Sequence, residues 1–282
     1  MKKTLMMKKF NHEPTRTVFV FLLMLAACST APKNPADIYD LRRQAEMQLD
    51  QGNKQADRGD CDNSLLLLNE AQRLAIVTDD PSLRIRTALA RGNVLYLLDR
   101  PQEALSEWEA ALAESVKEQN VELTAVSRIH LSRYRLLSRT SPANTVKADV
   151  EREMAFVKDK LYTAFAWTVS GMAEKEQGNY ADAETAFKKS LAIYEKDRYM
   201  EQAAYDWYLI ASCRSMAKNY AGARQALEQA IAFDRRVENS YGLAADWRAL
   251  GDVNKKDGKT AEAEAAYSRS GQIFRAMGKE TF

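Results

Sequence analysis

The sequence has few of the residues from which metal and redox sites are built. Its 282 residues include 2 histidines and 3 cysteines, and the cysteines are far apart in the chain. His12 belongs to an N-terminal stretch that we expect to be removed, which leaves His130. Sites with several histidines and Cys-x-x-Cys motifs are therefore excluded from the mature chain. We expect no metal and no other cofactor.

Proline and glycine are also scarce, at 6 and 11 residues. Both interrupt helices, whereas Ala, Leu, Glu, Lys, Arg and Gln favour them and dominate this sequence. The glycines stand singly and form no phosphate-binding loop. The composition thus predicts an all-α chain, without a nucleotide site of that kind.

The sequence lacks an apolar run long enough for a permanent membrane span. Its apolar stretch Val18–Ala27 follows a lysine-rich start and is about half the length that a bilayer requires. The stretch ends in Leu25-Ala26-Ala27-Cys28-Ser29, which resembles the bacterial lipobox. That resemblance implies a lipoprotein signal peptide at 1–27 and acylation of Cys28, with palmitate among the attached chains. The alternative is an ordinary secretory peptide that is cut nearby.

The residues after the predicted cleavage site indicate how the chain is held in the envelope. Residues 28–40 are polar, contain proline and are expected to form a flexible tether. Ser29 follows the cysteine where an Asp would favour inner-membrane retention, so resemblance to enterobacterial sorting implies the outer membrane, facing the periplasm. Removal of 1–27 changes the formal net charge from +2 to −2. The mature chain keeps no basic block that would indicate nucleic-acid binding.

A repeat dominates the rest of the sequence. Trp167, Trp207 and Trp247 recur every 40 residues. Each is followed by a tiny residue four positions later, an alanine after sixteen and a bulky apolar residue after twenty. The matching residues are Gly171, Ala211 and Gly251, then Ala183, Ala223 and Ala263, then Phe187, Leu227 and Tyr267. Such a repeat indicates one structural unit that buries its apolar face by stacking on its neighbours.

The same register extends toward the N-terminus. Gly52, Gly92 and Ser132 take the tiny position in three earlier units. We therefore expect about six helix-turn-helix units over 41–279, followed by a tail at 280–282. The expected turns lie at Gly59, Asp99-Arg100-Pro101, Gly178-Asn179, Lys218-Asn219 and Gly258-Lys259, with Gly or Asn in the left-handed conformation.

The third unit, 125–163, departs from the pattern, because the expected Ala and aromatic are missing after Pro142. Its second helix is still indicated by apolar residues at spacings of three and four. These residues are Val146, Val150, Met154, Val157 and Leu161. We expect a local change of packing there.

The order of Trp, small residue, turn, Ala and aromatic resembles the tetratricopeptide repeat (TPR). The usual unit is 34 residues, so this chain resembles the elongated variants of about 40. The resemblance implies a right-handed superhelical solenoid that binds protein or peptide partners on its concave side. The three repeat tryptophans are expected to stack in the core, and Trp108 to occupy the place of Phe187 in a second helix.

Side chains on the first helix of each unit are the candidates for partner binding. They are taken from positions just after the repeat start and at each successive turn. The candidates are Arg86, Asn93, Tyr96, His130, Arg133, Phe165, Met172, Tyr205, Tyr208 and Met216. Several could instead belong to the core between repeats. The family's carboxylate clamp, which captures a free C-terminus, is not reproduced, because Arg86 and Asn93 stand almost alone.

Four arginines near one another, Arg128, Arg133, Arg135 and Arg139, have two interpretations. They are either the exposed side of a helix or a patch that binds an anion or an acidic partner. Cys61 and Cys213 are expected to be free packing residues, because a disulfide between distant repeats would violate the short Cα separation it needs.

These features predict a membrane-anchored scaffold rather than an enzyme. One alternative is an accessory that presents a ligand to a periplasmic transport system. Another is an enzyme or thiol-redox protein. A Cys-His nucleophile pair would require His130 to meet Cys61 or Cys213 across the array. The last helix carries Ile273, Phe274 and Met277 close to the end of the chain, which raises the hypothesis of self-association there.

Overall fold

The computed structural model describes residues 40–278. The predicted signal peptide, Cys28, nearly all of the tether and the tail lie outside these residues. The chain divides into a unit that ends at Leu41 and a compact unit that begins at Arg42. The first described helix begins two residues before this boundary, and the rest of the described chain belongs to the second unit.

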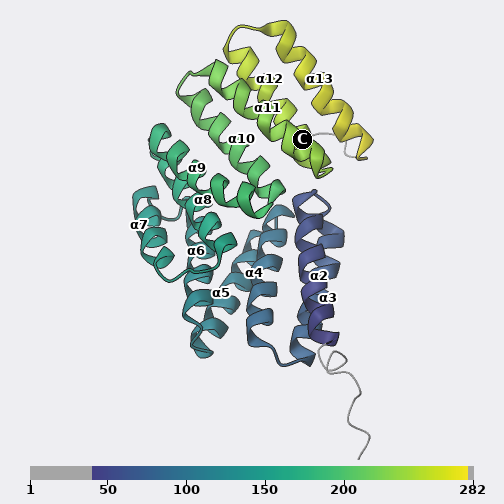
Figure 1. The fold of residues 1–282 in the computed structure, drawn as a ribbon, viewed down its shortest axis with the longest axis vertical. Coiled ribbons are helices and arrows are strands. Elements are labelled where there is room, and N and C mark those ends of the chain that lie inside the picture. Colours follow the sequence, from purple (N-terminus) through teal and green to yellow (C-terminus); the bar gives the residue numbers. More distant parts are fainter. Residues whose placement is uncertain (1–39, 279–282) are drawn as a thin grey trace, which may run out of the picture. The chain divides into compact units, whose positions relative to one another are not determined.

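The described residues form α-helices and no strand. The helices are α2 (Asp40–Asp57), α3 (Cys61–Val77), α4 (Pro81–Leu97), α5 (Pro101–Lys117), α6 (Val121–Leu137), α7 (Ala143–Met154), α8 (Lys160–Glu176), α9 (Tyr180–Asp197), α10 (Met200–Met216), α11 (Tyr220–Arg236), α12 (Ser240–Lys256) and α13 (Thr260–Ala276). Consecutive helices pack against each other (Figure 1). They form six pairs whose first helices start about 40 residues apart, so the predicted all-α array of six units is confirmed. None of these helices is long and apolar enough to cross a membrane.

Helix ends recur about every 20 residues, because each unit of about 40 residues contains two helices. A residue with positive φ ends nearly every helix, at intervals of 20 along each half of the chain. These residues are Gly59, Asp79, Asp99, Gln119 and Arg139, then Gly178, Arg198, Lys218, Glu238, Gly258 and Gly278. The expectation that Gly or Asn takes this conformation is confirmed at Gly59, Gly178 and Gly258 and is wrong at two of the predicted turns, where Asp99 and Lys218 take it. At Lys218-Asn219 the lysine adopts it, with φ of 61°, because Asn219 is needed as the cap that accepts the Gly222 N–H.

The tiny residues lie where the two helices of a pair cross, as predicted. A Cβ on Gly52 would lie 2.7 Å from Leu68 Cδ2, and one on Gly171 would lie 2.6 Å from Phe187 Cε1. Gly92 is in the same position against Trp108. Because a side chain is excluded at these points, the bulky residue sixteen positions later fills the crossing.

The third unit is irregular in a different way from the prediction. Helix α7 has 12 residues and ends at Met154, so Val157 lies in the following loop. Leu161 belongs to the next helix. The loop is held by Glu122 of α6, whose Oε1 accepts the backbone N–H groups of Lys158 and Asp159, each at 2.6 Å. These bonds and the Asp159 cap of α8 explain the early end of α7.

The first pair also contacts the last two pairs, which the repeat did not predict. Gln202 Nε2 of α10 donates to Asp57 Oδ2 at the end of α2, at 2.9 Å. A Cβ on Gly59 would lie 2.6 Å from Tyr241 Cβ of α12. Residues about 145 positions apart are thus in contact, so the array of pairs curves back on itself.

The tryptophans divide into two kinds. Trp108 is 1% exposed and, with Phe187, is among the largest fully buried side chains. Trp167, Trp207 and Trp247 are only half-buried, so the expectation that they form the stacking core is wrong in part. Two of them are covered by cations: Lys189 Nζ lies 3.9 Å from the ring centroid of Trp167, and Arg269 lies 4.7 Å from that of Trp247.

Candidate functional site

The first helices of neighbouring pairs contact one another, α4 with α6, α6 with α8 and α10 with α12. Together they form what we call the inner face. Two cavities open on this face at its C-terminal half. The larger has a volume of about 340 Å³. Its lining residues are Leu136, Leu137, Arg139, Met172, Lys175, Glu176, Tyr205, Tyr208 and Leu209.

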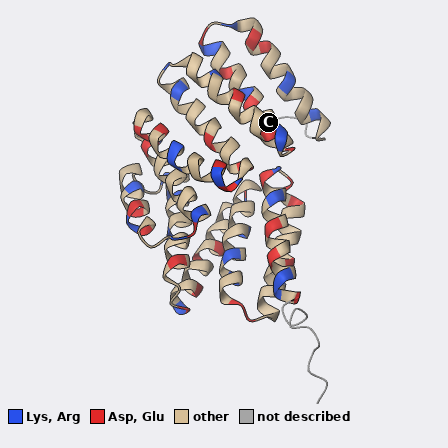
Figure 2. Ribbon diagram, viewed as in Figure 1, with Lys and Arg blue, Asp and Glu red and all other residues tan. Residues whose placement is uncertain are grey.

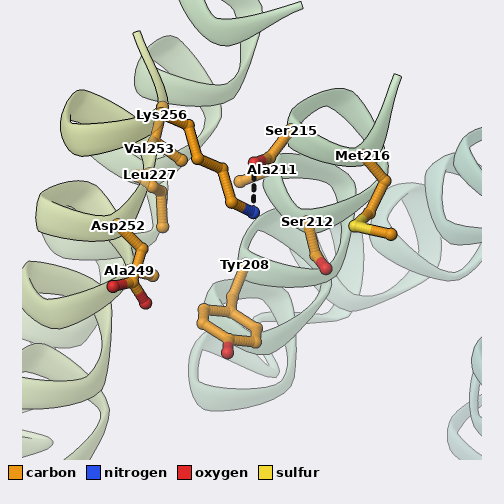
Figure 3. A pocket seen from close by; sticks show the side chains of 10 residues that line it. All are labelled: Tyr208, Ala211, Ser212, Ser215, Met216, Leu227, Ala249, Asp252, Val253 and Lys256. Carbon is orange, nitrogen blue, oxygen red and sulfur yellow. Dashed lines mark hydrogen bonds between the residues drawn. The ribbon is translucent and has the colours of Figure 1, made fainter. Parts of the chain in front are cut away.

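The smaller cavity, of about 110 Å³, lies between α10 and α12 (Figure 3). Its lining residues are Tyr208, Ala211, Ser212, Ser215, Met216, Leu227, Ala249, Asp252, Val253 and Lys256. Tyr208 lines both cavities, so they adjoin across one aromatic ring. We call the two together the groove.

Large apolar side chains are exposed along the groove. Leu137 is 37% exposed, Tyr205 45% and Met216 51%. The rings of Tyr205 and Tyr208 are nearly parallel, at an interplanar angle of 11° and a centroid separation of 6.3 Å. Burial of the two phenol groups raises the pKa of each. For Tyr205, whose side chain is half exposed, this agrees with a position in a hollow. The groove therefore offers apolar area that the chain itself leaves uncovered.

The charged side chains of the groove are of two kinds. Arg139 pairs with Glu176 at 3.6 Å, and Asp252 Oδ1 accepts the Tyr267 hydroxyl at 2.8 Å. Within the described chain, Lys175 and Lys256 form no ion pair. Lys256 Nζ lies 3.4 Å from Ser215 Oγ, directed into the smaller cavity (Figure 3).

Four of the ten predicted binding residues line the groove: Met172, Tyr205, Tyr208 and Met216. The other six lie on α4, on α6 and near the start of α8. We call this part the N-terminal half of the inner face, and aromatic rings fill the space there. His130 stacks on Phe165 with centroids 4.4 Å apart, and on Trp108 at 6.1 Å. Tyr96 contacts Trp108 as well, at 6.2 Å.

Three polar members of the predicted set differ in their surroundings. His130 is 4% exposed, and burial, with Arg133 nearby, lowers its pKa to about 3. Arg86 lies close to Tyr162, and its charge opposes part of the rise that burial causes in the pKa of that phenol. Asn93 is half-buried, and its Oδ1 has no hydrogen-bond partner among the described residues.

The residues at the C-terminal ends of the first helices were not predicted from the sequence as binding residues, apart from Met216. Met216 was selected, but its counterparts in the other repeats, Leu137, Glu176 and Lys256, were not, although they lie 39 or 40 residues apart. All four line the groove. The repeat register itself was therefore the signal that could have found them.

Three of the four arginines of the α6 cluster are neutralised by acidic residues. Arg128 pairs with Glu153 at 3.2 Å, Arg135 with Asp149 at 3.7 Å, and Arg139 with Glu176. The fourth, Arg133, lies near Tyr205, where its charge opposes part of the rise that burial causes in the pKa of that phenol. Basic and acidic residues are interspersed along the helices generally (Figure 2). The ion pairs agree with the interpretation of the cluster as the exposed side of a helix.

Several buried carboxyl groups lie beneath the C-terminal half of the inner face. Asp206 accepts hydrogen bonds from Thr168 and Ser190, and burial raises its pKa to about 7. Asp234 and Asp246 lie close to each other, and burial raises the pKa of both. Burial also raises the pKa of Asp57 to about 7, with Glu201 adding to the effect.

The remaining predicted chemistry concerns cysteine and the chain end. Cys61 and Cys213 do not form a disulfide with each other, as predicted, and burial raises the pKa of the Cys213 thiol to about 11. No cluster of His, Cys, Asp and Glu among the described residues could hold a metal ion. Phe274 of α13 is buried in an edge-to-face contact with Tyr241 at 5.9 Å. The described part of α13 exposes no large apolar side chain, so the structure lends no support to self-association there.

Comparisons with known proteins show the fold but no family. No family model matches the chain, and no curated protein matches it. The apo form of RapI matches with a TM-score of 0.58 and 14% identity, over 93% of this chain and 91% of that one. A Rap protein in complex with Competence and Sporulation Factor matches with a TM-score of 0.59 and 16% identity, over 84% of this chain and 67% of that one.

A third solved structure carries the name of the repeat. The nearly identical TPR-like repeats named for a kinesin light chain of Podosopora anserina match with a TM-score of 0.52 and 17% identity. The match covers 70% of this chain and 97% of that one. The fold expected from the sequence is confirmed: the described chain is an all-α solenoid of TPR-like helical repeats.

Proposed function

We propose that this protein is a membrane-anchored, non-catalytic scaffold that binds a segment of a protein partner in its groove. The observation that carries the proposal is the exposure of Leu137, Tyr205 and Met216 around two adjoining cavities. A Rap protein with a similar fold was solved in complex with a factor, which supports a binding role for this kind of array.

The energetics of the groove suit recognition of an inserted side chain. Burial of an aromatic or aliphatic side chain contributes about 1.5 to 3 kcal/mol. A small number of such anchors supplies most of the affinity at protein interfaces, with Tyr enriched among them. Tyr205 and Tyr208 are already stacked on each other, so little side-chain freedom is lost when a partner covers them.

The buried nucleophile and base support the non-catalytic part of the proposal. With a pKa of about 3, His130 remains neutral and cannot accept a proton near neutral pH. With a pKa of about 11, the Cys213 thiol is not a thiolate at that pH.

The anchoring part of the proposal comes from the leader. The Leu25-Ala26-Ala27-Cys28 sequence supports lipidation of Cys28 and attachment to the outer membrane on its periplasmic side. Labelled palmitate should enter the wild-type protein in its native cell but not the Cys28→Ala variant. Label that persists in that variant would contradict the anchor.

A photo-crosslinking experiment in the native cell tests the groove. A photoreactive amino acid replaces Tyr205 in one variant and the exposed Gln272 of α13 in a control variant. The groove variant should give a discrete adduct that is absent from the control. Adding Tyr208→Ala and Met216→Ala to the groove variant should weaken this adduct. Equal adducts at both positions, or none at position 205, would contradict the proposal.

A further inference from the structure

We infer that the groove recognises an extended segment in which a bulky apolar residue and an Asp or Glu are two positions apart. This inference rests on the proposed function and names the chemistry of the partner at the same site. It assigns the apolar side chain to the larger cavity and the carboxylate to the smaller one.

The larger cavity fits an apolar side chain. Its floor and walls include Leu136, Met172 and Leu209, in addition to the exposed Leu137 and Tyr205. Its one acidic residue, Glu176, is paired with Arg139 at 3.6 Å. Leucine and methionine adapt to different apolar shapes, so we expect Leu, Met or Phe to be accepted there.

The smaller cavity has the donors that a carboxylate needs. The Lys256 ammonium group is directed into it and reaches the Ser215 hydroxyl at 3.4 Å (Figure 3). Ser212 is on the same side of the cavity, and Asp252 lies toward the other end (Figure 3). A carboxylate between Lys256 and the two hydroxyls would accept charge-assisted hydrogen bonds, which are about twice as strong as neutral ones.

The charge of the groove favours an acidic partner over a basic one. Arg139 and Glu176 pair with each other, and Asp252 accepts a hydrogen bond from the Tyr267 hydroxyl. The other charged side chains of the groove, Lys175 and Lys256, form no ion pair within the described chain. A basic side chain would have Asp252 as a partner but would be close to Lys256. An acidic side chain would meet the Lys256 ammonium group, whose hydrogen-bond partner among the described residues is the neutral Ser215 hydroxyl.

The distance between the subsites sets the spacing in the partner. Tyr208 lines both cavities, so the two subsites adjoin at its side chain. In an extended segment, side chains two positions apart point the same way and are about 7 Å apart, which is comparable to the span of an aromatic ring and its contacts. The residue between them would point away from the inner face.

A selection of random linear peptides on the immobilised full-length mature protein tests the inference. We expect the selected peptides to share Leu, Met or Phe with an Asp or Glu two positions away on either side. For such a peptide, Lys256→Gln should raise Kd about tenfold, which corresponds to about 1.4 kcal/mol. The matched control is Lys255→Gln, since Lys255 is exposed next to it and lines neither cavity. This variant should leave Kd unchanged, and Lys256→Arg should retain binding.

The outcomes separate the inference from the proposed function. Selected peptides that lose binding in Tyr205→Ala but contain no acidic residue would overturn the inference and leave the groove as a binding site. Equal effects of Lys256→Gln and Lys255→Gln would do the same. Failure to select any peptide, or selection of peptides that bind Tyr205→Ala equally well, would overturn both. Thermal unfolding of each variant would show that it is folded.

Discussion

The two halves of the inner face use the same repeat position in opposite ways. Phe165 and Tyr205 are 40 residues apart and equivalent in the repeat. Phe165 stacks on the buried His130 at 4.4 Å, whereas Tyr205 is 45% exposed. The N-terminal half is filled by the chain's own side chains. The C-terminal half leaves space that another molecule can occupy.

The difference follows from the size of the neighbouring residues. Beside Phe165, the preceding repeat supplies His130, and α5 adds the ring of Trp108. The repeat that follows Tyr205 has Ala245 at the equivalent position, and Ala249 at the position equivalent to Leu209. Ala249 lines the smaller cavity. Small side chains at these points leave the groove open.

The largest predicted effect concerns the filled half. Trp108→Ala removes a fully buried ring and should lower the free energy of unfolding by about 3 to 5 kcal/mol, because a cavity remains. Urea denaturation measures this. Trp167→Ala is the control, since this ring is half-buried, and we expect about 1 kcal/mol there. A loss for Trp108→Ala no greater than that of the control would show that the aromatic cluster is not tightly packed.

The buried titratable groups should give the two halves opposite pH dependences, each worth about 1 to 3 kcal/mol. The pKa of His130 is lowered in the folded state, from 6.5 to about 3. Its contribution to stability is therefore present above 6.5 and is lost as the pH falls toward 3. The pKa of Asp206 is raised from 3.8 to about 7. Its contribution is present below 3.8 and is lost as the pH rises through 7.

Unfolding free energies measured across this pH range test the contrast. His130→Phe should reduce the loss of stability on the acid side, and Asp206→Asn should reduce the loss toward neutral pH. The exposed Asp50→Asn serves as the control and should leave the profile unchanged. If both buried-group variants shifted the profile in the same direction, the contrast would be wrong.

The open half should be as tightly packed below its surface as the filled half. Ala223 is fully buried where α11 crosses α10, so Ala223→Leu should cost about 1 to 3 kcal/mol through overpacking. Ala221→Leu is the matched control on an exposed position of the same helix. Equal thermal midpoints for the two variants would contradict the packing described for the pair.

The groove side chains should matter little for stability. Tyr205→Ala and Met216→Ala should each change the free energy of unfolding by no more than about 0.5 kcal/mol, because both side chains are half exposed. Each should still weaken the groove crosslinks or the selected peptides. Loss of stability similar to that of Trp108→Ala would show that these residues belong to the core.

The smallest effect on stability is expected from closing the groove. Ala249→Leu restores the residue found at the equivalent position in the preceding repeat, Leu209. It should fill part of the smaller cavity with a change of about 0.5 kcal/mol or less and reduce binding. Ala261→Leu, exposed on α13, is the control. Unchanged binding by Ala249→Leu would argue against a partner in that cavity.

Much of the fold could be predicted because it depends on local and repeated features. A small residue followed sixteen positions later by a bulky one predicts that the two helices of a pair cross there. The structure shows this contact between Gly92 and Trp108 and between Gly171 and Phe187. The short α7 was predicted as a longer helix, because Val157 and Leu161 continue its apolar spacing. The helix ends earlier because the Glu122 carboxylate, 36 and 37 residues away in sequence, accepts the backbone N–H groups of Lys158 and Asp159.

The candidate site was predicted less well than the fold. Tyr205, Tyr208, Met172 and Met216 line the groove, but Tyr96, His130 and Phe165 were equally plausible from their positions in the repeat. Whether such a side chain is exposed depends on the size of residues on adjacent helices, and periodicity does not report that.

The sequence by itself therefore determined the helices, their pairing and the period of 40, because each results from spacings within one or two units. Only the tertiary structure decided which half of the inner face is filled and that the end of α2 meets α10 through Asp57 and Gln202, 2.9 Å apart. The curvature that brings these residues together is the sum of small rotations from one pair to the next. It is set by side-chain packing along the whole array.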